Sequence, residues 1–129
     1  MEREWDAHKK GITDLAVGKG GGTVVTACVD EKRVKVWDMS AQGVPGVVKE
    51  INEFEDNQGK MHHTSFAVAI SPDGENIAMG GGSSTKSNGL VKVYEVRSWE
   101  IVAELIDLQT IFVGLVFSRD GNNLFTALR

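Results

Sequence analysis

The sequence predicts an all-β fold made of repeated antiparallel sheets, and three observations carry this prediction. Short apolar segments alternate with turns in a chain that has 15 glycines and 2 prolines. A strand–turn–strand pattern occurs three times, at spacings of about 50 residues. Two of the three copies are followed by a segment in which polar and apolar residues alternate, as they do in a half-buried strand.

Each copy of the pattern consists of two short apolar strands joined by a tight turn. In the second and third copies the turns are Ser-Pro-Asp-Gly and Ser-Arg-Asp-Gly, at 71–74 and 118–121, and their glycine can adopt the positive φ that such a turn requires. The expected strand pairs are 12–17 with 23–27, 66–70 with 76–80, and 113–117 with 123–127.

Third and fourth strands are expected after the first two copies. The segments 33–38 and 90–95 match position by position, with Lys, Val, an aromatic residue and an acid in the same order. The fourth strands, 46–51 and 100–106, have a weaker pattern. The apolar spacing of 100–106 also fits a short amphipathic helix, but its place in the repeat favours a strand.

These repeats resemble the WD-repeat (WD40) family of β-propellers, whose repeat ends in Trp-Asp and contains an upstream His. Trp37 and Asp38 form this dipeptide here, and His8 stands at the place of the upstream His, with Ala7 instead of the usual glycine. The resemblance extends from about Trp5 to the end of the chain. It implies antiparallel four-stranded blades of a β-propeller, at about 8–53 and 62–106, with a partial third blade at about 111–129.

The resemblance also implies a set of hydrogen-bonded polar residues that ties the strands of the first repeat together. Its candidate members are His8, Thr26, Asp30 and Trp37, in which a carboxylate orients an imidazole that holds a hydroxyl and an indole N–H. Such a set looks like a catalytic triad on paper. In a propeller blade it satisfies buried polar groups, so no catalytic residue is expected. Tyr94 replaces the tryptophan in the second repeat, where the same set is in doubt.

Composition and motifs argue against several other function classes. The net charge of −4, with 14 Lys and Arg against 18 Asp and Glu, differs from the basic footprint of a nucleic-acid binder or a membrane-surface anchor. The longest apolar run, 111–117, is far shorter than the ~20 residues of a membrane helix. His62 and His63 are adjacent and would point in opposite directions, so neither a metal nor a cofactor is expected. The glycine runs 18–22 and 80–82 lack the ending of a phosphate-binding loop and are expected to be turns.

The length indicates an incomplete propeller. Blades of ~40–45 residues in rings of at least four would need about 160 residues, and the chain has 129. Three explanations stay open: the chain is a fragment, another chain supplies the missing blades, or copies of the chain associate into a larger ring. We favour a fragment or a member of a larger assembly.

The expected function is that of a non-enzymatic scaffold that binds other proteins through its loops and open blade edges. The alternatives are a self-assembling partial propeller, or a ligand-binding or catalytic propeller whose site lies in the missing blades. The single cysteine, Cys28, cannot form an internal disulfide, which favours a reducing compartment, cytoplasmic or nuclear. Candidate partner-binding residues lie in the loops expected at one end of the propeller: Lys9, Lys10, Glu31, Lys32, His62, His63, Ser84 and Lys86.

Overall fold

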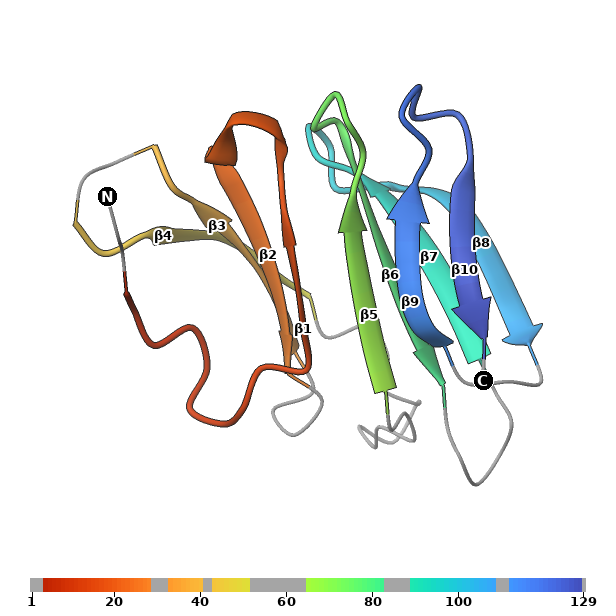
Figure 1. The fold of residues 1–129 in the computed structure, drawn as a ribbon, viewed down its shortest axis with the longest axis horizontal. Coiled ribbons are helices and arrows are strands. Elements are labelled where there is room, and N and C mark those ends of the chain that lie inside the picture. Colours follow the sequence, from red (N-terminus) through yellow and green to blue (C-terminus); the bar gives the residue numbers. More distant parts are fainter. Residues whose placement is uncertain are drawn as a thin grey trace.

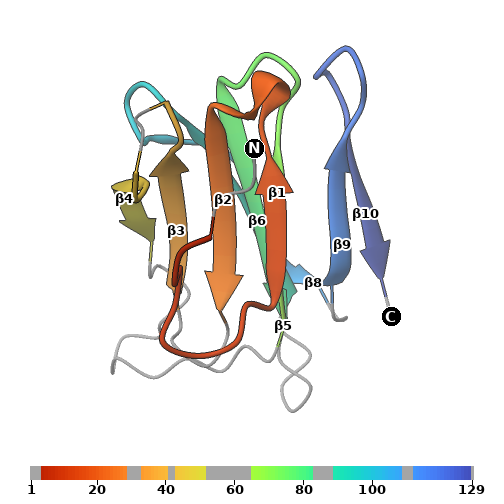
Figure 2. The same cartoon turned by 60° about the vertical axis from the view of Figure 1, so that its left-hand side comes forward.

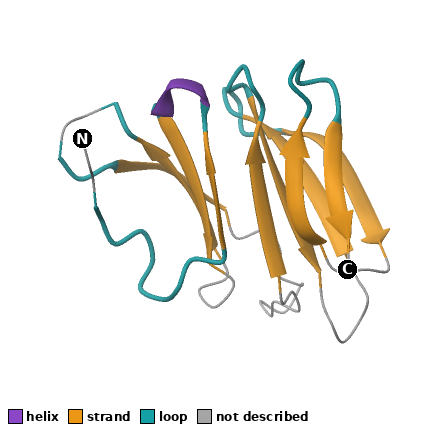
Figure 3. Ribbon diagram, in the orientation of Figure 1, coloured by secondary structure: helices purple, strands orange, loops and turns teal. Residues whose placement is uncertain are grey.

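The computed structural model describes residues 4–28, 33–40, 43–51, 65–82, 89–108 and 112–128. Strands make up nearly all of the regular structure in this part of the chain (Figure 3). The helical element among these residues is one 3-10 turn, η1 (Lys19–Gly21), between the first two strands. The predicted all-β class is therefore confirmed.

Three antiparallel sheets follow one another along the chain, and within each sheet neighbouring strands are consecutive. The first sheet contains β1 (Asp14–Val17), β2 (Thr23–Cys28), β3 (Arg33–Asp38) and β4 (Gly46–Ile51). The second contains β5 (Ser65–Ile70), β6 (Asn76–Gly82), β7 (Gly89–Glu95) and β8 (Ile101–Leu108). The third is a hairpin of β9 (Phe112–Phe117) and β10 (Leu124–Leu128).

The three sheets lie side by side, with their first strands adjacent (Figure 1). Strand β5 contacts β1 and β2 on one side and β9 on the other. Figure 2, turned by 60°, shows the β9–β10 hairpin beyond β5, at the opposite end of the stack from β3 and β4. Among the described residues the three sheets do not close on themselves, and their arrangement is that of an incomplete propeller, as the sequence predicts.

The alternating segments form strands because one set of side chains is buried between the sheets. In β3, Val34 and Val36 are buried at 0% and 2% exposure, whereas Lys35 between them points to the other face. The segment at 100–106, whose apolar spacing also fits a short helix, forms strand β8, which begins at Ile101 and ends at Leu108. Its pairing with β7 stabilises the extended form, whereas an isolated helix of this length is only marginally stable in water.

The core lies between the first and second sheets. From the first sheet it takes mainly β-branched side chains, and from the second it takes larger ones. Its buried members are Val25, Ala27, Val34, Val36 and Ile51 on one side, and Val68, Ile77, Met79 and Tyr94 on the other. This is the apolar burial that holds the two sheets face to face.

A carboxylate adds a polar link between the same two sheets. The Val68 backbone N–H in β5 donates to Asp14 Oδ2 at 3.0 Å, and the Leu15 backbone N–H donates to Asp14 Oδ1 at 2.8 Å. Asp14 lies in β1, so its side chain bridges the adjacent first strands of the two sheets. The bond supplies a partner for an N–H on the side of β5 that faces away from β6.

The hairpin turns of the second and third sheets have the same geometry. In the second, Ser71 Oγ donates to Asp73 Oδ1 at 2.6 Å, the Glu75 backbone N–H donates to the same oxygen at 2.9 Å, and Gly74 has φ +76°. In the third, Ser118 Oγ donates to Asp120 at 2.5 Å. These serine hydrogen bonds, followed by backbone N–H donors, lower the pKa values of the Asp73 and Asp120 carboxyls.

The glycine run at 80–82 does not form the expected turn. It continues β6, in which Gly80 pairs with Ala67 and Val91, and Gly81 pairs with Phe66 and Leu90. The prediction was wrong because pairing on both sides supplies the backbone hydrogen bonds that override the low strand propensity of glycine. The other glycine run, 18–22, is a turn as expected, with φ +79° at Gly20.

Each four-stranded sheet has a β-bulge at the same place in its outermost strand. Val36 pairs with Lys49 and Trp37 pairs with Val47, so Val48 has no opposite residue. In the second sheet, the equivalent unpaired residue of β8 is Val102, which precedes Ala103. Each bulge lies opposite a valine and the aromatic residue that follows it in the third strand, Trp37 in the first sheet and Tyr94 in the second. Both bulge residues are 54% exposed.

Candidate functional site

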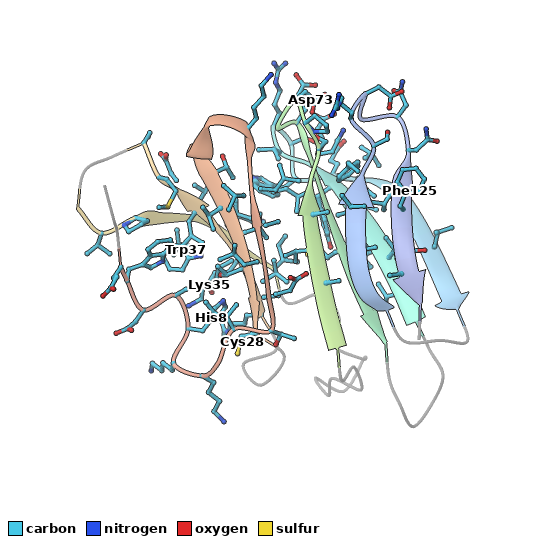
Figure 4. All side chains as sticks on the ribbon, in the orientation of Figure 1. His8, Cys28, Lys35, Trp37, Asp73 and Phe125 are labelled. Atoms are coloured by element: carbon cyan, nitrogen blue, oxygen red, sulfur yellow. The ribbon has the colours of Figure 1, made fainter. Side chains whose placement is uncertain are left out.

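A chain of hydrogen bonds joins three of the predicted polar residues across the first sheet. The Trp37 indole N–H donates to Thr26 Oγ1 at 3.0 Å, and the same oxygen lies 2.8 Å from His8 Nε2. The three residues come from β3, β2 and the segment before β1, and their exposures are 5%, 0% and 9%. The fourth predicted member, Asp30, lies outside the described residues. Figure 4 shows His8 and Trp37 beside the first sheet, near the N-terminal segment.

Lys35 joins this group, although the sequence analysis did not single it out. Its Nζ donates to the Ala7 backbone carbonyl at 3.0 Å and lies 5.8 Å from the centre of the Trp37 ring, a cation–π distance. Glu50 Oε1 is 4.0 Å from the same Nζ. The signal was present in the sequence, because residues two apart on a strand share a face and Lys35 is two residues before Trp37.

Aromatic packing fixes the N-terminal segment against the same face. The rings of Trp5 and Trp37 pack edge to face, with centroids 5.7 Å apart and planes at 65°. Ala7 and Val24 complete this small cluster, at 5% and 6% exposure. The segment thus lies over part of the first sheet, where the polar chain and the stacked rings hold it. The Trp5 Nε1 atom is buried and has no hydrogen-bond partner among the described residues.

An open pocket of about 620 Å³ lies beside this segment. Its walls combine two acidic side chains with apolar ones, and Ile12 and Leu15 there are 48% and 49% exposed. The lining residues are Glu4, Trp5, Asp6, Ala7, Ile12, Leu15 and Thr26. The Thr26 hydroxyl is already held by His8 and Trp37 at 0% exposure, so the reachable surface is mainly that of the other residues.

The candidate loop residues are only partly within the described chain. Lys9 and Lys10 are exposed in the connection that precedes β1. Figure 1 shows this connection at the lower end of the molecule, where β2 and β6 end and β5 begins. The other candidates lie outside the described residues: Glu31, Lys32, His62, His63, Ser84 and Lys86.

The hydroxyl at the centre of the polar chain is closed off from solvent. A nucleophilic hydroxyl must be accessible to a substrate, but Thr26 is buried and already accepts the indole hydrogen bond.

Within the described ranges, no three His, Cys, Asp or Glu side chains are grouped so as to hold a metal ion. The same part of the chain contains no helix of the length and apolar character needed to cross a membrane. Cys28 is a buried free thiol on β2.

The comparisons with known proteins agree with this architecture. Residues 1–38, which include His8, Thr26 and Trp37, match the family model of the WD40 repeat, described as WD domain, G-beta repeat. No curated protein matches the chain significantly. The match ends at Asp38, the last residue of β3. Residues 1–38 are therefore similar to a WD40 repeat, and they lie within antiparallel sheets of the form of partial propeller blades.

Proposed function

We propose that the chain is a non-enzymatic scaffold that binds other proteins as part of a larger assembly. The match of residues 1–38 to the WD40 repeat supports a role as a protein-interaction scaffold in general. The finer proposal rests on the state of His8, Thr26 and Trp37. Their polar groups, which could otherwise take part in catalysis, are buried and hydrogen-bonded to one another. Their role is then to hold a rigid platform from which exposed loops contact partners.

The partner-binding end is proposed to be the one that carries Lys9 and Lys10. Both side chains are exposed, and the connection that contains them is fixed at its base by the buried His8. An exposed basic pair on a fixed loop favours a partner with an acidic surface, since charge complementarity steers association. The single cysteine, Cys28, is buried, which supports a reducing compartment, cytoplasm or nucleus, as part of the same proposal.

The test is affinity capture with charge-reversal variants. Tagged wild-type chain, the double variant Lys9→Glu/Lys10→Glu and the control Lys19→Glu are expressed in the cells that produce the protein, and captured proteins are quantified by mass spectrometry. Lys19 is exposed on η1, at the opposite end of the sheets (Figure 1). We expect at least one protein to be captured by the wild type and the control but lost from the double variant.

Two results would contradict the proposal. If a partner is still captured by the double variant but lost with Lys19→Glu, the partner binds at the η1 end of the sheets and not at the Lys9 and Lys10 loop. Turnover of a substrate by the purified chain, abolished by His8→Ala without loss of the fold, would contradict the non-enzymatic role.

A further inference from the structure

The turn at 96–99, which joins β7 to β8, contains a strained backbone position. Trp99 has φ +58°, and the other positive φ values among the described residues belong to glycines. A bulky L-residue is rare in this left-handed region, because its Cβ comes too close to the following carbonyl oxygen. Such strain persists only where the surrounding contacts enforce it. The contacts of Trp99 therefore show what holds this turn in its conformation.

Main-chain hydrogen bonds close the turn at its base. The Glu95 N–H donates to the Glu100 carbonyl oxygen at 2.9 Å, and the Trp99 N–H donates to the Glu95 carbonyl oxygen at 2.7 Å. Glycine is the usual residue at the left-handed end of a turn with this second bond, since it has no Cβ. A tryptophan in that place needs compensating interactions of its own side chain.

The ring of Trp99 has such interactions with both the first and the second sheet. Its side chain is partly buried and packs against the core cluster that lies between the two sheets. The Lys49 Nζ of β4 lies over the ring, 5.9 Å from its centre, which is a cation–π distance. Lys49 pairs with Val36, a core residue at 2% exposure, so its side chain leaves β4 on the face that is turned toward the second sheet.

A second set of contacts joins the turn to the β5–β6 hairpin, whose own turn lies at the same end of the molecule (Figure 1). The Val96 N–H donates to the Glu75 carbonyl oxygen at 2.9 Å, and Arg97 Nη2 lies 3.8 Å from Glu75 Oε1. The two charged side chains are 83% and 58% exposed, so water screens this ion pair and the main-chain bond is the stronger contact. The turn is thus held from two sides, by Lys49 of the first sheet and by Glu75 of the second.

We propose that the turn at 96–99 is a two-state conformational device that the charge of Lys49 holds closed. In the closed state, which the structure shows, the ammonium group keeps the Trp99 ring at the interface between the two sheets, and the ring keeps the backbone in the left-handed region. In the open state the ring leaves this interface and the backbone of residue 99 relaxes. Neutralising Lys49 shifts the population toward the open state, because the charge interacts with the ring in the closed state alone.

Opening changes the polar surface at this end of the second sheet. Arg97 and Ser98 are exposed in the turn, and the Ser98 hydroxyl donates to Glu95 Oε1 at 3.0 Å. Both side chains move with the turn, so a change at Lys49 on the first sheet is coupled to a surface of the second. The inference goes beyond the proposed scaffold role, and all its readouts use the chain alone.

Amide hydrogen exchange, followed by NMR on the full chain, tests this device. The Val96 N–H is the reporter, because its bond to Glu75 breaks when the turn opens. Lys49→Met removes the charge and keeps an apolar side chain of similar length. We expect exchange at Val96 to become about two- to five-fold faster, as for the loss of one partly exposed cation–π contact. In the wild type, Trp99 should show a strong NOE between its amide and Hα protons, which lie close together at positive φ.

Three further variants assign the effect to the charge and to the ring. Lys49→Arg keeps the cation and should exchange at Val96 like the wild type. Lys19→Met removes an exposed lysine of η1 and should do the same. Trp99→Leu keeps an apolar contact but has no ring, so adding Lys49→Met in this background should give no further acceleration. Trp99→Met takes its place if circular dichroism shows that the leucine variant is not folded.

Each other outcome overturns the proposal. Unchanged exchange in Lys49→Met means that packing alone holds the turn, and acceleration in Lys49→Arg or Lys19→Met means that the specific charge over the ring is not the cause. Acceleration by Lys49→Met that persists without the ring means that the charge acts on another group. An equal acceleration at Val25, a core residue at 0% exposure, indicates loss of stability of the whole fold instead of opening of the turn. A wild type without the strong NOE has no left-handed Trp99 to release.

Discussion

Replacing Thr26 with valine tests whether the hydroxyl at the centre of the polar chain stabilises the first sheet. Valine keeps the shape of threonine, so the change removes one oxygen without opening a cavity. The Trp37 indole N–H, at 5% exposure, loses its acceptor, and His8 Nε2 loses its hydrogen-bond partner on Thr26. A buried polar group without a partner costs ~1–3 kcal/mol. His8 is 9% exposed and can regain some water, so we expect a loss of about 2–3 kcal/mol in the free energy of unfolding.

Urea unfolding, followed by circular dichroism, measures this loss, and a double-mutant cycle assigns it. Trp37→Phe removes the indole N–H, so in that background Thr26→Val should cost about 1–2 kcal/mol less. Thr23→Val, on the same strand but on its other face, is the matched control and should change stability by about 0.5 kcal/mol or less. The reasoning is refuted if Thr26→Val costs no more than the control, or costs the same in both backgrounds.

Two further predictions concern the link between sheets and the hairpin turns. Asp14→Ala removes the acceptor of the Val68 N–H, so we expect a loss of about 1–2 kcal/mol and faster amide exchange at Val68; unchanged exchange would contradict the link. Ser71→Ala removes the largest cause of the lowered pKa of Asp73, so this pKa should rise toward its usual 3.8 in a carbon-detected NMR titration. Because a lowered pKa adds stability above 3.8 that is lost as the pH falls through the folded value, the variant should also lose stability less steeply in acid; identical titration curves would show that the serine does not act on the carboxyl.

The strands could be predicted because their determinants are local. The alternation in Arg33–Asp38 follows directly from one buried and one open face, and β3 has these same bounds. The aspartate and glycine of the turns fix the hairpins in the same local way, through a side-chain acceptor and a positive φ at Gly74 and Gly121. Local pattern failed at Gly80–Gly82, where pairing with two neighbouring strands decides the conformation.

The site could be predicted only in part, because it depends on the path of the N-terminal segment. The family resemblance brought His8, Thr26 and Trp37 together, and the structure places their polar atoms within hydrogen-bond distance. It gave no reason to expect Trp5 against Trp37, or Lys35 on the Ala7 carbonyl, since these contacts join segments far apart in sequence.

The bulges at Val48 and Val102 determine where further chains can be added. Both lie in outermost strands, β4 and β8, whose free edges would otherwise offer a regular row of N–H and C=O groups to a passing strand. One extra residue breaks the two-residue repeat of that row and increases the local twist. An incoming strand cannot stay in register across such a break. Growth sideways is thereby blocked at the rim of each four-stranded sheet.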